Sequence, residues 1–466
     1  MKTRFAPSPT GQLHLGNVRT ALYNALMARH ENGVFLLRLE DTDAERSRNE
    51  FIGMLMQDLS WLGLPWQEGP EVGGAHGPYR QSERRAIYDE YFDRLQADGQ
   101  AYPCFCSGQE LKLSRKALQS AGKPPRYSGK CVHLTADEVT KYRAEGRKAT
   151  LRFRVPRKEV IVFDDKVRGE QKFNSEDIGD FIIRRSDGTP AFFFSNAVDD
   201  ALMEVSLVVR GEDHLTNTPR QMMLLRTLGL RVPDYAHIAL VVGDDGAPLS
   251  KRHGSRTVAS LREEGYLPLA ICNYLARLGH HYENNDHMSM DELGAAMVTE
   301  HMHRAPARFD AAQLFHWQKE AVMHATDQQL WHSWSAWGRS LSNIIGDAKS
   351  IGFVRAVRGN VVLPADAMRL AEQLTGDDVI LSTDAENAIQ QAGREFFSIA
   401  LNELQRNHED FKSYAKAVGE AIGVKGKGLF MPLRAALTGE VHGPEMAQIW
   451  SLLGPERIKQ RIQSQS

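Results

Sequence analysis

The chain has 466 residues, of which 42% are apolar and 25% are charged, and its formal net charge is −2. This length exceeds one compact core and predicts two to four domains, while the near-neutral charge argues against a protein that coats nucleic acid. No apolar run approaches the ~18 residues that span a bilayer, and prolines interrupt the N-terminus where a signal segment would be apolar. Four cysteines are too few for a disulfide scaffold, so we expect a reducing, cytoplasmic location.

The first sixty residues predict a strand, a helix and a second strand. Residues 3–6 are predicted to form a short buried strand, and apolar residues then recur at helical spacing from Asn17, the predicted N-cap. Residues 34–39 form an apolar run of strand length. This order predicts two parallel strands joined by a right-handed crossover. Ligands bind beyond the carboxyl ends of such strands, where the loops at 7–17 and 40–43 are expected to meet.

The loop at the helix start carries groups that suit a nucleotide. Backbone N–H groups and the helix dipole favour a phosphate there. His14 can donate to charge that grows on that phosphate, and Gly16 leaves room for a base to stack on the backbone. By itself, a histidine at a helix start is more often a cap or a surface residue. Neither the Walker motif nor the dinucleotide glycine motif is present.

Two longer strings identify the segment. Residues 4–17 read RFAPSPTGQLHLGN and residues 37–43 read LRLEDTD. Both resemble the class I aminoacyl-tRNA synthetases for glutamate and glutamine, and HLGN is similar to their HIGH element. The resemblance implies that the chain uses ATP, with Mg²⁺, to activate an amino acid in the presence of bound tRNA.

A second phosphate-contacting loop is predicted at residues 248–254, which read PLSKRHG and follow an expected strand at 238–242 and a turn. It resembles the family's KMSKS loop, in which the ammonium of Lys251 can follow the β- and γ-phosphates as pyrophosphate leaves. Pro248 stands where the family usually has a lysine, so one positive charge is missing and the loop is stiffer. With His14 and Lys251 as the catalytic pair, the residues assigned to ATP are His14, Gly16, Asn17, Asp213, Ser250, Lys251 and Arg252.

A glutamate site needs one partner for a side-chain carboxylate and another for an α-ammonium. Arginine suits the carboxylate because its fork binds both oxygens. We expect Arg4 and Arg210 to project from strand ends into one crevice, where Glu40 accepts the ammonium. The resemblance assigns to glutamate the residues Arg4, Ala6, Ser8, Glu40, Phe192, Asn196 and Arg210.

Two side chains near this site have simpler interpretations. Phe192 stands where the family often has a tyrosine, which removes one hydrogen bond worth about 1 kcal/mol. Arg38 is expected to form a salt bridge with Asp41 or Asp43 instead of contacting a substrate.

Four potential metal ligands occur as two close pairs, Cys104 with Cys106 and Cys131 with His133. Three thiolates and one imidazole make a closed, structural zinc site, although the pattern alone also fits a cluster of reduced thiols. The resemblance to bacterial glutamyl-tRNA synthetases favours one Zn²⁺ per chain. It also places the pairs in an insert at residues 87–191 that receives the acceptor end of the tRNA.

The last third of the chain shows helical patterning without alternating strands. Tryptophans at 317, 331, 334 and 337 have the spacing of a helix face, so core packing is favoured over a base-stacking platform. Cys272 is expected inside an apolar helix. Residues 427–439 resemble the last conserved-looking stretch of the glutamate enzymes, in which Arg434 matches a position that contacts the anticodon.

The expected fold is an α/β Rossmann-like class I synthetase catalytic domain with an inserted zinc-containing α+β connective domain, followed by an all-α anticodon-binding region. The expected domains are 1–86 with 192–240 (catalytic), 87–191 (insert), 241–320 (stem contact, with the KMSKS-like loop) and 321–466 (anticodon binding). The expected partners are ATP, L-glutamate and tRNA(Glu), without a membrane, and a monomer is expected. Whether tRNA(Gln) is also a substrate is left open.

Three alternatives stay beside this hypothesis. The glutamine enzyme is expected to end in β-barrels, and a short paralogue that glutamylates a modified tRNA base lacks the C-terminal third altogether. A non-catalytic tRNA-binding relative should lose catalytic residues, and only Pro248 and Phe192 point in that direction.

Overall fold

The computed structural model describes residues 1–466 apart from 43–48, 123–124, 250–255, 338–340, 377 and 407–409. Residue contacts divide the chain into two units, and the predicted domain boundary at residue 320 falls inside a helix, α12. The units are Met1–Ala259 with Cys272–Asp310, and Ser260–Ile271 with Ala311–Ser466.

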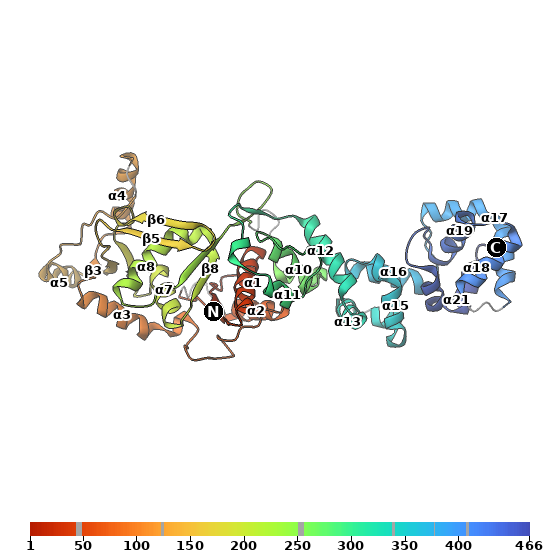
Figure 1. Ribbon diagram of the computed structural model, residues 1–466, viewed down its shortest axis with the longest axis horizontal. Coiled ribbons are helices and arrows are strands. Elements are labelled where there is room, and N and C mark those ends of the chain that lie inside the picture. Colours follow the sequence, from red (N-terminus) through yellow and green to blue (C-terminus); the bar gives the residue numbers. More distant parts are fainter. Residues whose placement is uncertain (43–48, 123–124, 250–255, 338–340, 377, 407–409) are drawn as a thin grey trace. The chain divides into compact units, whose positions relative to one another are not determined.

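The predicted strand, helix and strand are present as β1 (Lys2–Phe5), α1 (Leu15–His30, labelled in Figure 1) and β2 (Val34–Leu37), and β1 and β2 are parallel. The helix begins earlier than predicted, with His14 and not Asn17 as its N-cap. The cause is Leu15, which is fully buried and extends the apolar face of the helix by one turn.

Two further parallel strands lie beside this unit. β8 (Leu207–Gly211) pairs in parallel with β9 (Asp234–Ile238). β1 lies beside the start of β8, because the backbone N–H of Ser206 donates to the carbonyl of Lys2 at 2.9 Å. The carboxyl ends of β1 and β8 therefore lie at the same edge of the strands.

The predicted insert also contributes to this sheet. The hairpin of β5 (Val160–Asp165) and β6 (Gly169–Asn174) extends it, with Asp165 opposite Tyr235, to give the order β6-β5-β9-β8. Two strands of residues 87–191 therefore pair in the same sheet as β8 and β9.

The rest of the insert forms a three-stranded antiparallel sheet with exposed helices. Its strands, in the order β3-β4-β7, are β3 (Ala101–Cys104), β4 (Thr150–Phe153) and β7 (Phe181–Arg184). Capping boxes begin both α4 (Gly108–Ser120) and α5 (Ala136–Ala144), neither of which has a buried residue. One hydrophobic core, which includes Phe153 and Val208, joins this sheet to the catalytic strands.

Shorter elements complete the first two thirds of the chain. They are α2 (Asn49–Trp61), η1 (Gln81–Glu83), α3 (Arg85–Ala97), α6 (Ser175–Ile178), α7 (Phe192–Leu202), η2 (Glu212–Asn217), α8 (Thr218–Thr227), β10 (Val241–Val242), α9 (Val258–Glu264), α10 (Pro268–Arg277), α11 (Met290–Ala295), η4 (Thr299–His301) and β11 (Ala307–Arg308). The strand predicted at 238–242 is divided between β9 and β10. Cys272 is buried in α10, as predicted.

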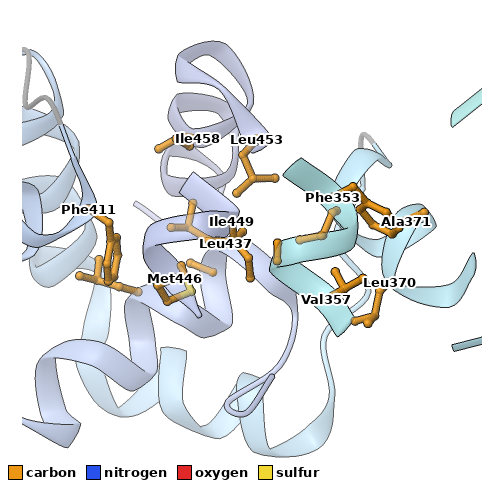
Figure 2. Packing of buried hydrophobic residues seen from close by; sticks show 14 of the residues in the cluster. Phe353, Val357, Leu370, Ala371, Phe411, Leu437, Met446, Ile449, Leu453 and Ile458 are labelled. Atoms are coloured by element: carbon orange, nitrogen blue, oxygen red, sulfur yellow. The ribbon is translucent and has the colours of Figure 1, made fainter. Parts of the chain in front are cut away.

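The C-terminal unit is helical, and its described residues contain no strand. Its elements are α12 (Ala311–His324), α13 (Asp327–Trp337), α14 (Leu341–Ile345), η5 (Asp347–Lys349), α15 (Ser350–Val357), η6 (Arg358–Asn360), α16 (Pro364–Thr375), α17 (Thr383–Leu404), α18 (Phe411–Ile422), α19 (Lys427–Thr438), α20 (Met446–Leu453) and α21 (Pro455–Gln463). Figure 2 shows residues such as Phe353, Leu437 and Ile449 packed in its core. A helical C-terminal third excludes the β-barrel ending expected of the glutamine enzyme.

The tryptophan prediction is confirmed at three of the four positions. Trp317 and Trp334 are buried, and Trp331 packs partly against the core. Trp337 is 40% exposed and donates its indole N–H to the carbonyl of Glu263, so core packing is wrong there. None of the described helices combines the length and the apolar composition that crossing a membrane requires.

Candidate active site

One cavity, with a volume of about 440 Å³, lies beyond the carboxyl ends of β1 and β8. Its walls come from the loop after β1, the first turn of α1, the segment after β2, α7 and residues 240–249. Every residue predicted to bind glutamate lines it: Arg4, Ala6, Ser8, Glu40, Phe192, Asn196 and Arg210. The fold thus gathers in one place a set that is scattered along the chain.

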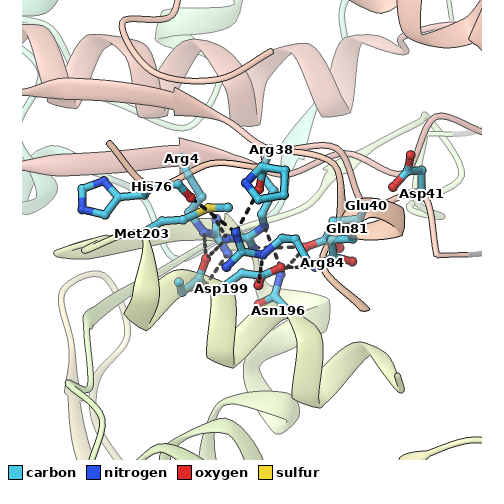
Figure 3. Close-up of polar contacts among 12 residues, drawn as sticks. Arg4, Arg38, Glu40, Asp41, His76, Gln81, Arg84, Asn196, Asp199 and Met203 are labelled. Atoms are coloured by element: carbon cyan, nitrogen blue, oxygen red, sulfur yellow. Dashed lines mark hydrogen bonds and ion pairs between the residues drawn. The ribbon is translucent and has the colours of Figure 1, made fainter. Parts of the chain in front are cut away.

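A buried network of charges lies along one side of the cavity (Figure 3), and Arg4, Glu40 and Asn196 are its members that line the cavity. Asp200 accepts from Nε of Arg4 at 3.1 Å and from Nη1 of Arg38 at 2.7 Å. Glu40 accepts from Arg38 at 3.1 Å and from the amide of Asn196 at 2.6 Å. Despite burial, Arg4 and Arg38 hold the pKa of Asp200 below its usual value. Burial raises the pKa of Glu40, and its partners offset only part of that effect.

The partners of Arg38 differ from the prediction. Asp41 instead accepts from the backbone N–H and the hydroxyl of Ser82, both at 2.8 Å, and lies 3.4 Å from Arg80. Asp43 lies outside the described residues. The reason is the alternation of side chains: Arg38 points to the buried side with Glu40, whereas Asp41 points toward the start of α3.

Asp199, the neighbour of Asp200 on α7, fastens the cavity wall to α3. It accepts from Nε of Arg84 at 2.7 Å, from the hydroxyl of Tyr88 at 2.7 Å and from the amide of Gln81 at 2.8 Å. All these groups are buried. Sequence reasoning missed both aspartates, because their role depends on arginines more than a hundred positions away.

Arg210 differs from the other buried arginines of this cavity. In the described part of the chain it forms no ion pair with a carboxylate, and its Nη1 has no hydrogen-bond partner. It is 5% exposed, and burial, together with the nearby charge of Arg4, lowers its pKa to about 10. An unpaired buried cation is costly, so this position suits an anionic ligand.

Three of the predicted ATP residues line the same cavity. Gly16, Asn17 and Asp213 line it, and a Cβ placed on Gly16 would meet no atom within 4 Å, which leaves the space over its backbone open. His14 does not line the cavity; it forms a β-bridge with Thr257.

The chain reaches the KMSKS-like segment from this cavity and returns beside the HIGH-like element. Pro248 and Leu249 line the cavity, and the backbone N–H of Val258 donates to the carbonyl of Leu13 at 3.1 Å. Ser250, Lys251 and Arg252 themselves lie outside the described residues.

The phenyl ring of Phe192 lies at the cavity with its centroid 5.3 Å from the ring of His214. Burial, followed by the charge of Arg210, lowers the pKa of His214 to about 4. At neutral pH this histidine is therefore uncharged and adds no further cation to a site that already holds several arginines.

Three of the four predicted zinc ligands come together. The sulfurs of Cys104, Cys106 and Cys131 all lie within 4.8 Å of one another. His133 is exposed and lies outside this group, because the turn at 131–133 carries it to the surface. The hydroxyl of Tyr127 is instead 3.4 Å from the sulfur of Cys104 and 3.5 Å from that of Cys106. Clustered thiolates are preferred zinc ligands, so the donor set fits this metal.

Arg434, the predicted anticodon residue, lies on α19 and is half-buried. Its Nη1 donates to the carbonyl of Pro444 at 2.7 Å, and Gly443 and Pro444 line a cavity of about 250 Å³. The hydrogen bond fixes the guanidinium against this loop.

Comparisons with known proteins agree with this geometry. Residues 1–316 match the catalytic domain of the class I tRNA synthetases for glutamate and glutamine, and residues 370–465 match an anticodon-binding domain. The chain is 55% identical to Glutamate–tRNA ligase 2 of Nitrosococcus oceani over 464 residues, which cover 100% of this chain and 98% of that protein. It is also 55% identical to Glutamate–tRNA ligase 2 of Alkalilimnicola ehrlichii, over 99% of this chain and 97% of that one.

A solved structure resembles the chain over its full length. The crystal structure of a glutamate tRNA ligase from Elizabethkingia meningosepticum, in complex with its amino acid, matches with a TM-score of 0.89 at 29% identity and covers 100% of this chain and 99% of that one. The catalytic cavity, the helical C-terminal unit and these matches agree with one another. The chain belongs to the family of class I tRNA synthetases for glutamate and glutamine.

Proposed function

We propose that this chain is a glutamate–tRNA ligase that forms glutamyl-adenylate from glutamate and ATP and transfers the glutamyl group to the 3′-terminal adenosine of tRNA(Glu). The observation that carries the proposal is the buried Nη1 of Arg210, a cationic donor without a partner among the described residues, in the cavity that Gly16 and Asn17 also line. Full-length similarity to ligases named for glutamate supports it.

The residues of the cavity can hold glutamate at both of its charged ends. Arg210 takes the side-chain carboxylate, and Glu40, held by Arg38 and Asn196, takes the α-ammonium. Arg4 is already neutralised by Asp200, so it stiffens the wall and contributes long-range positive potential. With both ends fixed, the α-carboxylate is left directed toward the nucleotide.

The chemistry requires positioning and charge stabilisation, and no covalent nucleophile. The α-carboxylate attacks the α-phosphate of ATP, and pyrophosphate leaves. A ribose hydroxyl of the tRNA then attacks the acyl carbon, and AMP leaves. Backbone N–H groups at the start of α1 and the side chain of His14 face charge that builds on the phosphates, and Lys251 follows the departing pyrophosphate. Mg²⁺ that accompanies ATP supplies further charge neutralisation when bound.

We also propose that Cys104, Cys106 and Cys131 hold one structural zinc. The hydroxyl of Tyr127, which contacts two of the sulfurs, is better placed than the imidazole of His133 to complete the ligand set. Zinc would fix the turns that carry α4, in the part of the chain proposed to receive the tRNA acceptor end. All four cysteines of the chain are free, which supports a reducing, cytoplasmic location.

The remaining domain roles are proposals of the same kind. Residues 241–320 are proposed to contact the tRNA stem, and the helical C-terminal unit to bind the anticodon with Arg434 in contact with a base. The match of residues 370–465 to an anticodon-binding domain supports the second role.

Aminoacylation with purified components tests the function. The protein is incubated with ATP, labelled glutamate or glutamine, and purified tRNA(Glu) or tRNA(Gln). We expect glutamate to be attached to tRNA(Glu), and the tRNA(Gln) arm shows whether the specificity is relaxed. Attachment of neither amino acid to either tRNA would favour the non-catalytic relative, to which Pro248 and Phe192 point.

A further inference from the structure

Arg210 is held from behind by groups that do not line the cavity. In the sheet it lies opposite His237 of β9, and its Nε donates to Nε2 of that histidine at 3.2 Å. Nη2 donates to the hydroxyl of Thr218 at 2.8 Å and to the amide oxygen of Gln221 at 2.7 Å. Every nitrogen of the guanidinium except Nη1 is therefore engaged by the protein.

These contacts determine the protonation state of His237. An arginine Nε–H can only donate, so Nε2 of His237 must accept and carries no proton. The proton of the neutral imidazole is then on Nδ1, which lies 2.5 Å from Oδ2 of Asp165. Because a carboxylate accepts, Nδ1–H donates to it, and this hydrogen bond selects the tautomer that Arg210 requires. Burial, which outweighs the pull of Asp165, lowers the pKa of His237 and keeps it neutral.

Asp165 is itself rigidly placed at the end of β5. Its Oδ1 accepts from the backbone N–H groups of Val167 at 3.0 Å and Arg168 at 2.8 Å. Both Asp165 and His237 have fully buried side chains. The backbone N–H of His237 also lies 3.2 Å from each carboxylate oxygen of Asp165. An aspartate from the predicted insert is thus fixed against β9, with Oδ2 directed at the imidazole.

We propose that Asp165, acting through His237, is a positioning and specificity-determining residue that turns Arg210 so that only Nη1 is presented to the side-chain carboxylate of glutamate. The proposal rests on the proposed function, because it assumes that this carboxylate is the ligand of Arg210. Neither residue touches the substrate.

The substitution Asp165→Asn tests the tautomer with little change in shape. The remaining Oδ1 can still accept from the two backbone N–H groups, but the new Nδ2 donates toward Nδ1 of His237. The imidazole must then carry its proton on Nε2, which faces the donor Nε–H of Arg210. The matched control is Asp164→Asn, the same change at the preceding residue. Its side chain is 71% exposed and forms an ion pair with Lys166 at 3.5 Å.

Kinetics of tRNA-dependent ATP–pyrophosphate exchange separate positioning from general damage. We expect Asp165→Asn to raise KM for glutamate by at least about tenfold, because the hydrogen bond that orients a charged binding group is lost. We expect kcat and KM for ATP to stay within about twofold of the wild-type values. His237→Asn removes the acceptor for Arg210 by another route and should give the same pattern. Asp164→Asn should match the wild type.

The outcomes distinguish the inference from the function on which it rests. Absence of glutamate-dependent exchange in the wild type would overturn the proposed function. A wild type that activates glutamate, with Asp165→Asn and His237→Asn both unchanged in KM, would overturn the positioning role alone. The role is also rejected if both variants show a lower kcat together with higher KM values for glutamate and for ATP. It is rejected as well if both variants fail to fold while Asp164→Asn folds.

Discussion

Two buried arginines, Arg38 behind the cavity and Arg210 on its wall, should respond in different ways to the same substitution. Arg38 is paired with Asp200 at 2.7 Å and with Glu40 at 3.1 Å, whereas Arg210 has no carboxylate partner among the described residues and is the proposed anchor for the substrate. We therefore compare Arg38→Gln with Arg210→Gln.

The magnitudes follow from what each change leaves unpaired. Arg210→Gln removes a charged hydrogen bond to the ligand, worth about 1.5–3 kcal/mol, so KM for glutamate should rise about 10- to 150-fold. It also removes an unpaired buried cation, so the free energy of unfolding should change little. Arg38→Gln leaves two buried carboxylates without their shared cation, which costs about 3–5 kcal/mol and lowers Tm by roughly 10 °C.

The assays are glutamate-dependent pyrophosphate exchange in the presence of tRNA, and thermal unfolding followed by circular dichroism. The expected pair of results is a stable Arg210→Gln with weak glutamate binding and an Arg38→Gln with a lowered Tm. If Arg210→Gln kept the wild-type KM for glutamate, or lost as much stability as Arg38→Gln, the assignment of Arg210 to the substrate carboxylate would be refuted.

Three further predictions concern other parts of the molecule. Lys251→Ala should abolish most pyrophosphate exchange while the circular dichroism spectrum stays unchanged, and unaltered exchange would refute its catalytic role. Elemental analysis should find about one zinc per chain and much less in Cys131→Ser, whereas a metal-free preparation that is fully folded and active would remove the zinc site. Burial lowers the pKa of His280 from 6.5 to about 4, so the denatured state takes up protons first and stability is lost as pH falls from about 6.5 toward 4. Tm measured across this range should fall less in His280→Gln, and an equal fall in both proteins would contradict this origin.

The local pattern of apolar residues was sufficient to predict the helices and strands whose periodicity is clearest. The parallel pairing of β1 with β2, the buried strand β8 and the helical C-terminal unit all follow from apolar periodicity. The ends of the helices were predicted less accurately. The N-cap of α1 is His14 and not Asn17, because tertiary packing buries Leu15.

Side-chain partners were beyond the reach of the sequence. The motifs indicated which residues surround the cavity, yet Arg38 pairs with Asp200 and not with Asp41. Asp165 lies in the predicted insert, and the sequence around it contains no motif that predicts a contact with β9. The turn after Cys131 likewise exposes His133, and the spacing of the ligand pairs carried no signal for Tyr127. Such contacts depend on strand pairing between segments that are distant along the chain.

The most direct test of the account is a crystal structure of the protein with a non-hydrolysable glutamyl-adenylate analogue. We predict that the side-chain carboxylate lies on Nη1 of Arg210, that the α-ammonium lies on Glu40, and that His14 and Lys251 approach the same nucleotide. Binding of the analogue in another cavity, or a lysine and a histidine that face separate cavities, would contradict it.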